Sequence, residues 1–217
     1  MNWVRNNSWI TRVALFLVAG CVTACGYPLS FTLEFPTSSD LGELWLVEDV
    51  NCFTCGAGEK HLGRATGSRN IYLPAAHWFV SLRMPKNASE LLPHLAHPSL
   101  SNIGDVNLEG SDVKDEGLKY IAHLNLRSIN LNRTQITGAG LRYLRPNEKW
   151  IFVDLRGCEK LDLKYLVHFK GWKRSTVSVV GYKWGEKNTD QEKRLLEVAN
   201  HVICDNQPEN VCGTQIR

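Results

Sequence analysis

Apolar and polar positions repeat in one design three times between residues 103 and 158. The copies are I-G-D-V-N-L-E-G-S (103–111), L-R-S-I-N-L-N-R-T (126–134) and W-I-F-V-D-L-R-G-C (150–158). Each copy reads apolar-x-x-apolar-x-Leu-x-x-polar, and its second apolar position recurs after 129 − 106 = 23 and 153 − 129 = 24 residues. A constant period in the twenties predicts a solenoid in which every coil holds one strand and one short helix or turn.

Weaker copies extend this array in both directions. H-W-F-V-S-L-R-M-P (77–85) places Val80 and Leu82 in the paired apolar positions, with Val80 aligned 26 residues before Val106. Downstream, Val177 follows Val153 by 24 residues, and Val202 follows Val177 by 25. We therefore expect about five coils and a degenerate end over residues 77–205, followed by a tail at 206–217.

The second half of each coil repeats as well, in D-V-K-D-E-G-L-K-Y-I (112–121) and Q-I-T-G-A-G-L-R-Y-L (135–144). Gly117 and Gly140 fall at the same place, and each is followed by apolar residues three apart, the spacing of a short helix. Asp115 and Thr137 stand near the two helix starts, where we expect their oxygens to cap free N–H groups. The third coil is shorter here and lacks the glycine.

These residues carry a resemblance to a known family. I-N-L-N-R-T-Q-I-T-G-A-G-L-R-Y-L (129–144) resembles a leucine-rich repeat of the bacterial L-x-L-x-x-T-x-I-T-x-x-G-L-x-x-L type. The match is good at 106–121, partial at 153–166 and weak at 80–95 and 177–198. The resemblance implies an α/β fold: a short, curved, right-handed solenoid with a parallel sheet on its concave face. It implies protein–protein interaction and no catalytic chemistry of its own.

The resemblance also explains a polar position shared by the three clear coils. Ser111, Thr134 and Cys158 occupy it, and in leucine-rich repeats this residue points inward and hydrogen-bonds the backbone at the turn. We therefore interpret Cys158 as a buried thiol and not as a nucleophile.

The first twenty residues have the three parts of a secretory signal. A positive region precedes the apolar run V-A-L-F-L-V-A-G (13–20), which is too short to span a bilayer. V-A-G-C (18–21) resembles a bacterial lipobox, so Cys21 is the favoured site of lipidation, with Cys25 of V-T-A-C as the alternative. We expect a signal peptide at 1–20, a tether at 21–30 and a membrane anchor through an N-terminal lipid, with the outer membrane or cell surface favoured. An ordinary cleaved signal is the competing interpretation.

A β-rich cap is predicted over residues 31–76, with strand candidates at 31–35, 43–47 and 70–74. Solenoids need such caps because an end coil would otherwise expose its apolar face. Within the cap, Cys52 and Cys55 form a C-x-x-C pair, for which we favour a local disulfide over a redox site. Cys204 and Cys212 form a second candidate disulfide after a predicted helix at 189–199. A buried Cys204 thiol is the alternative.

The residues that alternate with the buried strand positions are expected to face the concave surface and bind an unknown protein partner. We expect a column of Ser81, Asn107, Asn130, Asp154 and Ser178. Beside it we expect Arg83, Glu109, Asn132 and Arg156. Within this face, the favoured partner-binding residues are Asn107, Glu109, Asn130, Asn132, Phe152, Asp154 and Arg156. Phe152 is the favoured anchor because an aromatic side chain is unusual on a polar face, and Trp150 is expected in the core.

Charge and motifs argue against other functions. The net charge is +3, and it falls to +1 when the first twenty residues are removed, so no basic surface predicts nucleic-acid binding. His94 and His97 lack a third ligand nearby, so no metal site or cofactor is expected. No catalytic motif is present. We expect a non-catalytic binding or scaffolding module of the bacterial cell envelope. The alternatives are an exported thiol–disulfide redox protein and a purely structural envelope protein.

Overall fold

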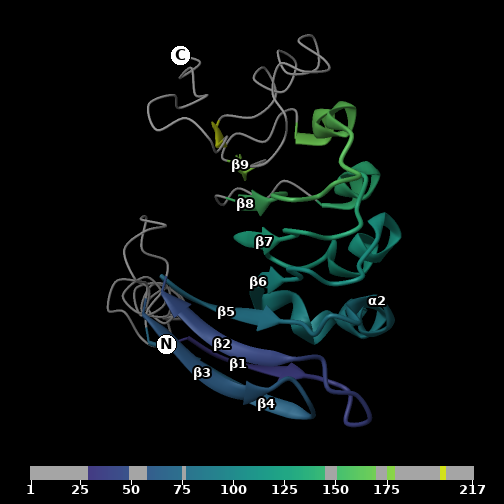
Figure 1. Ribbon diagram of the computed structural model, residues 1–217. Helices are drawn as coiled ribbons and strands as arrows, with labels where there is room; N and C mark the ends of the chain where they lie inside the picture. Colours follow the sequence, from purple (N-terminus) through teal and green to yellow (C-terminus); the bar gives the residue numbers. More distant parts are fainter. Residues whose placement is uncertain are drawn as a thin grey trace, which may run out of the picture.

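A computed structural model describes residues 29–48, 58–74, 77–144, 151–169, 175–178 and 201–203. They form a two-stranded sheet, β1-β4, and an eight-stranded sheet in the order β10-β9-β8-β7-β6-β5-β2-β3 (Figure 1). The strands are β1 (Leu29–Glu34), β2 (Glu43–Glu48), β3 (Glu59–Arg64), β4 (Ser68–Leu73), β5 (Trp78–Arg83), β6 (Ile103–Asn107), β7 (Ser128–Asn130), β8 (Ile151–Asp154), β9 (Ser175–Ser178) and β10 (His201–Ile203). The helical segments are α2 (Ala88–Leu91) and the 3₁₀ helices η1 (Leu92–Ala96), η2 (Pro98–Asn102), η3 (Asp115–Ile121), η4 (Ala139–Tyr143) and η5 (Leu163–Phe169).

The N-terminal strands are antiparallel. β1 pairs with β4, and β2 pairs with both β3 and β5. The three strands expected in this region are confirmed as β1, β2 and β4. β3 was missed because its sequence, E-K-H-L-G-R, does not alternate apolar with polar residues. The main sheet includes β2 and β3 of the expected cap as well as the strands after residue 77. It therefore runs without a break from the expected array into the expected cap.

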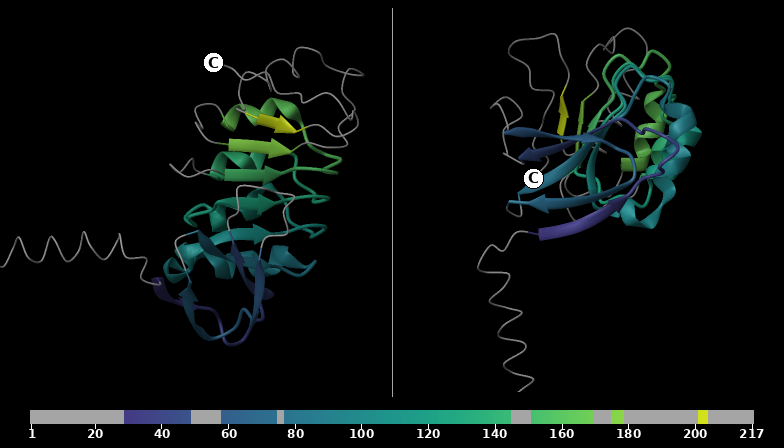
Figure 2. Two further views of the ribbon diagram at one scale, coloured as in Figure 1. Left: turned by 90° about the vertical axis from the view of Figure 1, so that its left-hand side faces the viewer. Right: turned by 90° about the horizontal axis from the view of Figure 1, so that it is seen from below.

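From β5 onward the sheet is parallel, and each new strand is added beside the one before it. The register aligns Leu82, Val106, Ile129, Val153, Val177 and Val202 in one row across the six strands. The expected positions of Val177 and Val202 are therefore confirmed. The strand connections run through the helical turns, which lie beside the stack of strands (Figures 1 and 2).

The expected alignment of the first coil is wrong by two residues. Val80 pairs with Ile103 and not with Val106, while Leu82 takes the place opposite Val106. The register shifts between Val80 and Ser81, where Gly104 is an extra residue on the partner strand. A Cβ on Gly104 would lie 2.9 Å from Cβ of Phe79, so this bulge needs a glycine. The true spacing is 106 − 82 = 24 residues, which is more regular than the sequence alignment suggested.

The core lies between the sheet and the helical turns. The paired strand residues expected to point inward, such as Val106 with Leu108 and Ile129 with Leu131, are fully buried. Leu118 and Ile121 of η3 are buried against them, because residues three apart lie on one side of a 3₁₀ helix. Full burial of each such side chain contributes on the order of 1.5–3 kcal/mol, so the stacked coils share one continuous core.

No helix among the described residues is long and apolar enough to cross a membrane.

Candidate binding face

One face of the main sheet is covered by the core, and the other, called here the outer face, carries the alternate side chains. Two rows of cross-strand neighbours run along it. The first row is Trp45, Ser81, Asp105, Ser128 and Phe152, and the second is Glu43, Arg83, Asn107, Asn130 and Asp154. The expected column is corrected at its start, because Arg83 and not Ser81 stands beside Asn107. This correction follows from the bulge at Gly104.

Three residues of the second row support the turn that follows their own strand. Asn107 Oδ1 accepts a hydrogen bond from the backbone N–H of Glu109 at 2.9 Å. Asn130 Oδ1 does the same for Asn132 at 2.9 Å, and Asp154 Oδ1 for Arg156 at 3.0 Å. Side chains of this type that bond the backbone two residues ahead stabilise tight turns. Three of the residues expected to bind a partner therefore have a structural role, one in each of three successive coils.

Three of the expected surface residues are buried, and the first of them, Ser81, is 2% exposed. Asn132 is 9% exposed and Asp154 is 2% exposed. The Asp154 carboxylate is held by Arg156, whose Nη2 lies 2.6 Å from Oδ2 and whose Nε lies 2.9 Å from both carboxylate oxygens. Pairing of this kind compensates the desolvation of a buried carboxylate. Arg156 keeps 45% of its side chain exposed, so it is the part of this pair that reaches the surface.

Glu109 is an exposed acid of the outer face. Asn132 Nδ2 donates to its Oε1 at 3.1 Å, and Asn130 Nδ2 donates to its Oε2 at 3.5 Å. Both asparagines belong to the next coil, so the carboxylate is oriented across the coil boundary. Glu109 and Arg156 thus present opposite charges, and Phe152 is half-buried in the neighbouring row. This end of the face combines an aromatic side chain with oriented charges.

A second group on the outer face was missed from the sequence. The Arg83 guanidinium lies 4.2 Å from the ring centroid of Trp45, and Arg83 Nη2 lies 2.7 Å from Glu59 Oε1. The Trp45 and His61 rings are 4.8 Å apart. The antiparallel register of β2 brings Trp45 beside Ser81, and no local pattern reveals pairing between strands more than thirty residues apart.

Asp105 lies between two serines in the first row. Ser81 and Ser128, one from each neighbouring strand, both donate hydroxyl hydrogen bonds to its carboxylate. Burial raises the pKa of Asp105, although the hydrogen bonds from Ser128 and Ser81 and the charge of Arg83 act in the opposite direction. Each serine donates its hydroxyl hydrogen to the acid, so Asp105 is the acceptor in this triplet.

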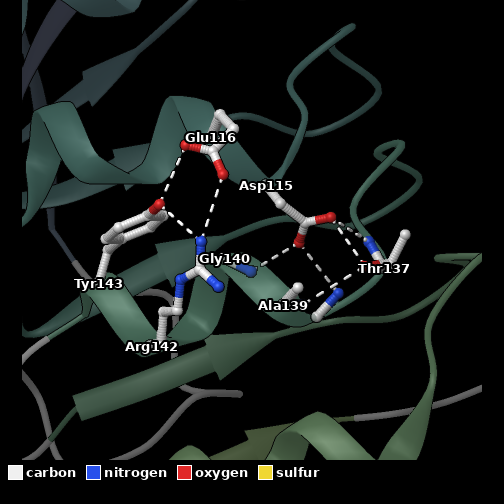
Figure 3. A network of polar contacts seen from close by, with 8 residues as sticks. Asp115, Glu116, Thr137, Ala139, Gly140, Arg142 and Tyr143 are labelled. Atoms are coloured by element: carbon white, nitrogen blue, oxygen red, sulfur yellow. Dashed lines mark hydrogen bonds and ion pairs between the residues drawn. The ribbon is translucent and has the colours of Figure 1, made fainter.

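The helical side carries a different repeat that the sequence analysis also missed. Each of three coils places a basic residue over the ring of the tyrosine that follows it, at 4.8–5.0 Å from the centroid. The pairs are Lys119 with Tyr120, Arg142 with Tyr143, and Lys164 with Tyr165. In the middle pair, Glu116 accepts from Tyr143 Oη at 3.0 Å and lies 3.3 Å from Arg142 Nη2 (Figure 3). Such contacts stabilise neighbouring coils by small amounts.

Asp115 links two coils through four hydrogen bonds. Its Oδ1 accepts from the N–H groups of Gly138 at 3.1 Å and Gly140 at 2.8 Å, and its Oδ2 accepts from Thr137 N at 3.0 Å and Oγ1 at 2.8 Å (Figure 3). Of the two expected caps, that of Thr137 is confirmed, because its Oγ1 accepts from the N–H of Ala139 at 3.4 Å. Asp115 caps η4 of the next coil and not its own helix. Burial raises its pKa, but the bonds from Gly140, Thr137 and Gly138 outweigh this, and its pKa is lowered.

The shared polar position behaves as expected in two coils. Thr134 Oγ1 donates to the Leu131 carbonyl at 2.7 Å, and Cys158 Sγ donates to the same carbonyl at 3.1 Å. Ser111 is buried at the equivalent place, and its hydroxyl has no hydrogen-bond partner there. Burial raises the pKa of the Cys158 thiol, with partial opposition from Thr134, so the prediction of a buried, unreactive thiol keeps its support.

The remaining predicted sites lie outside the described residues or remain separate. Outside them fall Trp150, the helix at 189–199, and the cysteines Cys21, Cys25, Cys52, Cys55, Cys204 and Cys212. His97 Nδ1 lies 2.7 Å from Ser99 Oγ. The described part of the chain contains no group of three or more His, Cys, Asp or Glu side chains arranged to hold a metal ion.

Comparison of the chain with protein-family models, with curated protein sequences and with solved structures finds no match.

Proposed function

We propose that this chain is a lipid-anchored, non-catalytic binding module of the bacterial cell envelope, built as a short leucine-rich-repeat solenoid. The lipid would be carried by Cys21, with Cys25 as the alternative. Val22 after Cys21 is not the aspartate that resembles an inner-membrane retention signal, which favours the outer membrane or the cell surface. The outer face of the sheet would bind a protein partner.

The observation that carries this proposal is the repeated turn at the ends of β6, β7 and β8. Asn107, Asn130 and Asp154 repeat one side-chain-to-backbone bond, so successive coils present the outer face in the same orientation. A face preorganised in this way loses little conformational freedom on binding. On it lie Arg156, whose residue type is enriched among interface hot spots, and Phe152, one of the aromatic residues that are enriched at interfaces.

Partner capture tests the proposed face. We would compare the full chain with Phe152→Ala, Arg156→Glu and Glu109→Lys as baits for envelope proteins. Lys119→Glu, on the helical side, is the control for a charge change away from the face. We expect the three outer-face variants to lose at least about tenfold of the captured partner, in line with hot-spot losses above 1.4 kcal/mol. Equal capture by every variant would reject the outer face as the binding surface.

Fatty-acid labelling tests the anchor separately. We expect incorporation of label into the full chain and its loss in Cys21→Ala, while Cys25→Ala retains it. The reverse pattern would move the lipid to Cys25. Absence of label from the full chain would leave an exported protein with an ordinary cleaved signal and would reject the anchor.

A further inference from the structure

We propose that the end of the two-stranded β1–β4 sheet at which Leu29 pairs with Leu73 lies against the lipid bilayer that holds the anchor. This inference rests on the proposed function, because it needs the N-terminal lipid. The contact surface consists of Leu29, where β1 begins, and Tyr72, near the end of β4.

Exposed hydrophobic side chains distinguish this end of the β1–β4 sheet. The described residues include three large, strongly exposed hydrophobic side chains: Leu29 at 56%, Tyr72 at 62% and Val167 at 52%. Leu29 and Tyr72 occupy diagonally adjacent positions at this end, on opposite faces of the sheet, because the antiparallel register pairs Leu29 with Leu73 and Ser30 with Tyr72. Pro74, the residue after β4, is exposed as well. Apolar groups that cluster at one exposed place usually mark a contact surface.

The same end of the β1–β4 sheet carries no charged side chain. The first four cross-strand pairs, from Leu29 with Leu73 to Thr32 with Asn70, contain no ionisable side chain except the tyrosine hydroxyl. The charged residues of the β1–β4 sheet, Glu34 and Arg69, lie in the last two pairs. An end without charges approaches the lipid headgroups without the cost of desolvating an ion. Tyrosine is one of the two residues enriched at membrane interfaces, where its ring is buried and its hydroxyl stays hydrated.

The length of the chain before β1 favours the membrane over other partners. Leu29 follows Cys21 by only 29 − 21 = 8 positions. A fully extended segment of that length spans at most about 29 Å, so an acylated Cys21 keeps the start of β1 close to the bilayer. Cys25 would bring it closer still. Val167 lies in η5, which stands at the other end of the stack of coils from β1 (Figure 1).

The alternation of side chains along β1 and β4 decides how the β1–β4 sheet would approach the bilayer. Leu29 shares a strand face with the buried Leu33, whereas Tyr72 lies on the opposite face of the sheet. The apolar surface therefore wraps around the end of the two strands and does not cover one face. The β1–β4 sheet would contact the headgroup region with the end of its strands. The outer face of the main sheet would stay available to a protein partner.

Photocrosslinking tests the contact on the full acylated chain. Tyr72 is replaced by p-benzoylphenylalanine in one sample and Val167 in another, and both are reconstituted into vesicles of phosphatidylethanolamine and phosphatidylglycerol. After irradiation we expect lipid adducts at position 72 to exceed those at position 167 by at least about tenfold. Equal, background adducts at both positions, in protein whose N-terminal peptide carries acyl chains, would overturn the proposed contact and leave the anchor intact. Absence of acyl chains would overturn the anchor and the contact together.

A second measurement separates this contact from a structural effect. Transfer of the acylated protein between vesicles should become about tenfold faster in the Leu29→Ser, Tyr72→Ser double variant, because less apolar surface leaves water on binding. Val167→Ser, equally exposed, should transfer at the wild-type rate. Unchanged transfer in the double variant would reject the contact. Because both replaced side chains are exposed, urea unfolding of the double variant should match that of the wild type.

Discussion

The carboxylate of Asp115 and the backbone of Gly140 join two successive coils. Gly140 N–H donates to Asp115 Oδ1 at 2.8 Å, and a Cβ at position 140 would lie 2.4 Å from the Asp115 carbonyl oxygen. The glycine of the repeat is thus required by the close approach of the preceding coil. Gly117 has an equivalent role one coil earlier, where a Cβ would lie 2.8 Å from Leu92 Cδ1. The contact at Gly117 is with a movable side chain, and the contact at Gly140 is with backbone.

Gly140→Ala should therefore destabilise the protein substantially. The new methyl group meets backbone atoms that cannot move aside, and overpacking of this kind costs roughly 3 kcal/mol. Urea unfolding followed by circular dichroism measures the change. Gly110→Asn is the matched control, because Gly110 has φ +64° with no atom within 4 Å of its Cβ position, and asparagine tolerates this conformation. A Gly140→Ala variant as stable as Gly110→Asn would contradict the close approach.

Asp115→Asn should weaken the link between the two coils and change its pH dependence. The folded-state pKa of Asp115 is lowered, so its stabilisation is complete above the unfolded value of about 3.9 and is lost as the pH falls through the folded value. We expect the variant to lose about 1 kcal/mol at neutral pH, as for other helix caps. The difference from the wild type should disappear in strong acid. Unfolding curves collected between pH 2 and pH 7 test this, and a difference independent of pH would contradict it.

Asp105→Asn should have the opposite effect. Burial raises the folded-state pKa of Asp105, so the folded protein prefers the protonated acid and its stability falls as the pH rises through that value. An amide keeps one acceptor and gains a donor for Ser81 and Ser128 without a charge. We therefore expect Asp105→Asn to unfold at a higher urea concentration than the wild type at pH 7, with the gain shrinking toward pH 4. Lower stability at pH 7 would show that the ionised carboxylate is needed.

Cys158 should resist alkylation in the folded protein. Its thiol is buried, its pKa is raised by that burial, and it donates to the Leu131 carbonyl. Iodoacetamide treatment before and after unfolding in urea, followed by peptide mass spectrometry, should modify position 158 only in the unfolded chain. Cys158→Thr places there the residue found at position 134 and should change stability by less than about 1.5 kcal/mol. Rapid modification of the native protein would contradict the buried thiol.

Local pattern was sufficient for much of the repeat. The buried pairs, the short helices and the inward polar position at Thr134 and Cys158 all follow from residues close in sequence. The outer face was predicted less well. Asn107, Asn130 and Asp154 were expected to contact a partner, which stays a prediction, and the structure adds that their side chains bond the backbone two residues ahead. The polar character of these residues is visible in the sequence, but the acceptor each one chooses depends on how the strand ends.

By itself, the sequence determined the spacing of the coils, because a period of 23 or 24 residues places equivalent apolar side chains in one buried row. Only the tertiary structure decided which residues meet across the coils. The bulge at Gly104 shifted the first coil, the antiparallel addition of β2 brought Trp45 beside Arg83, and Asp115 capped the next helix in place of its own. Each of these relations joins residues more than twenty positions apart, and their pairing is set by packing and hydrogen bonding of whole strands.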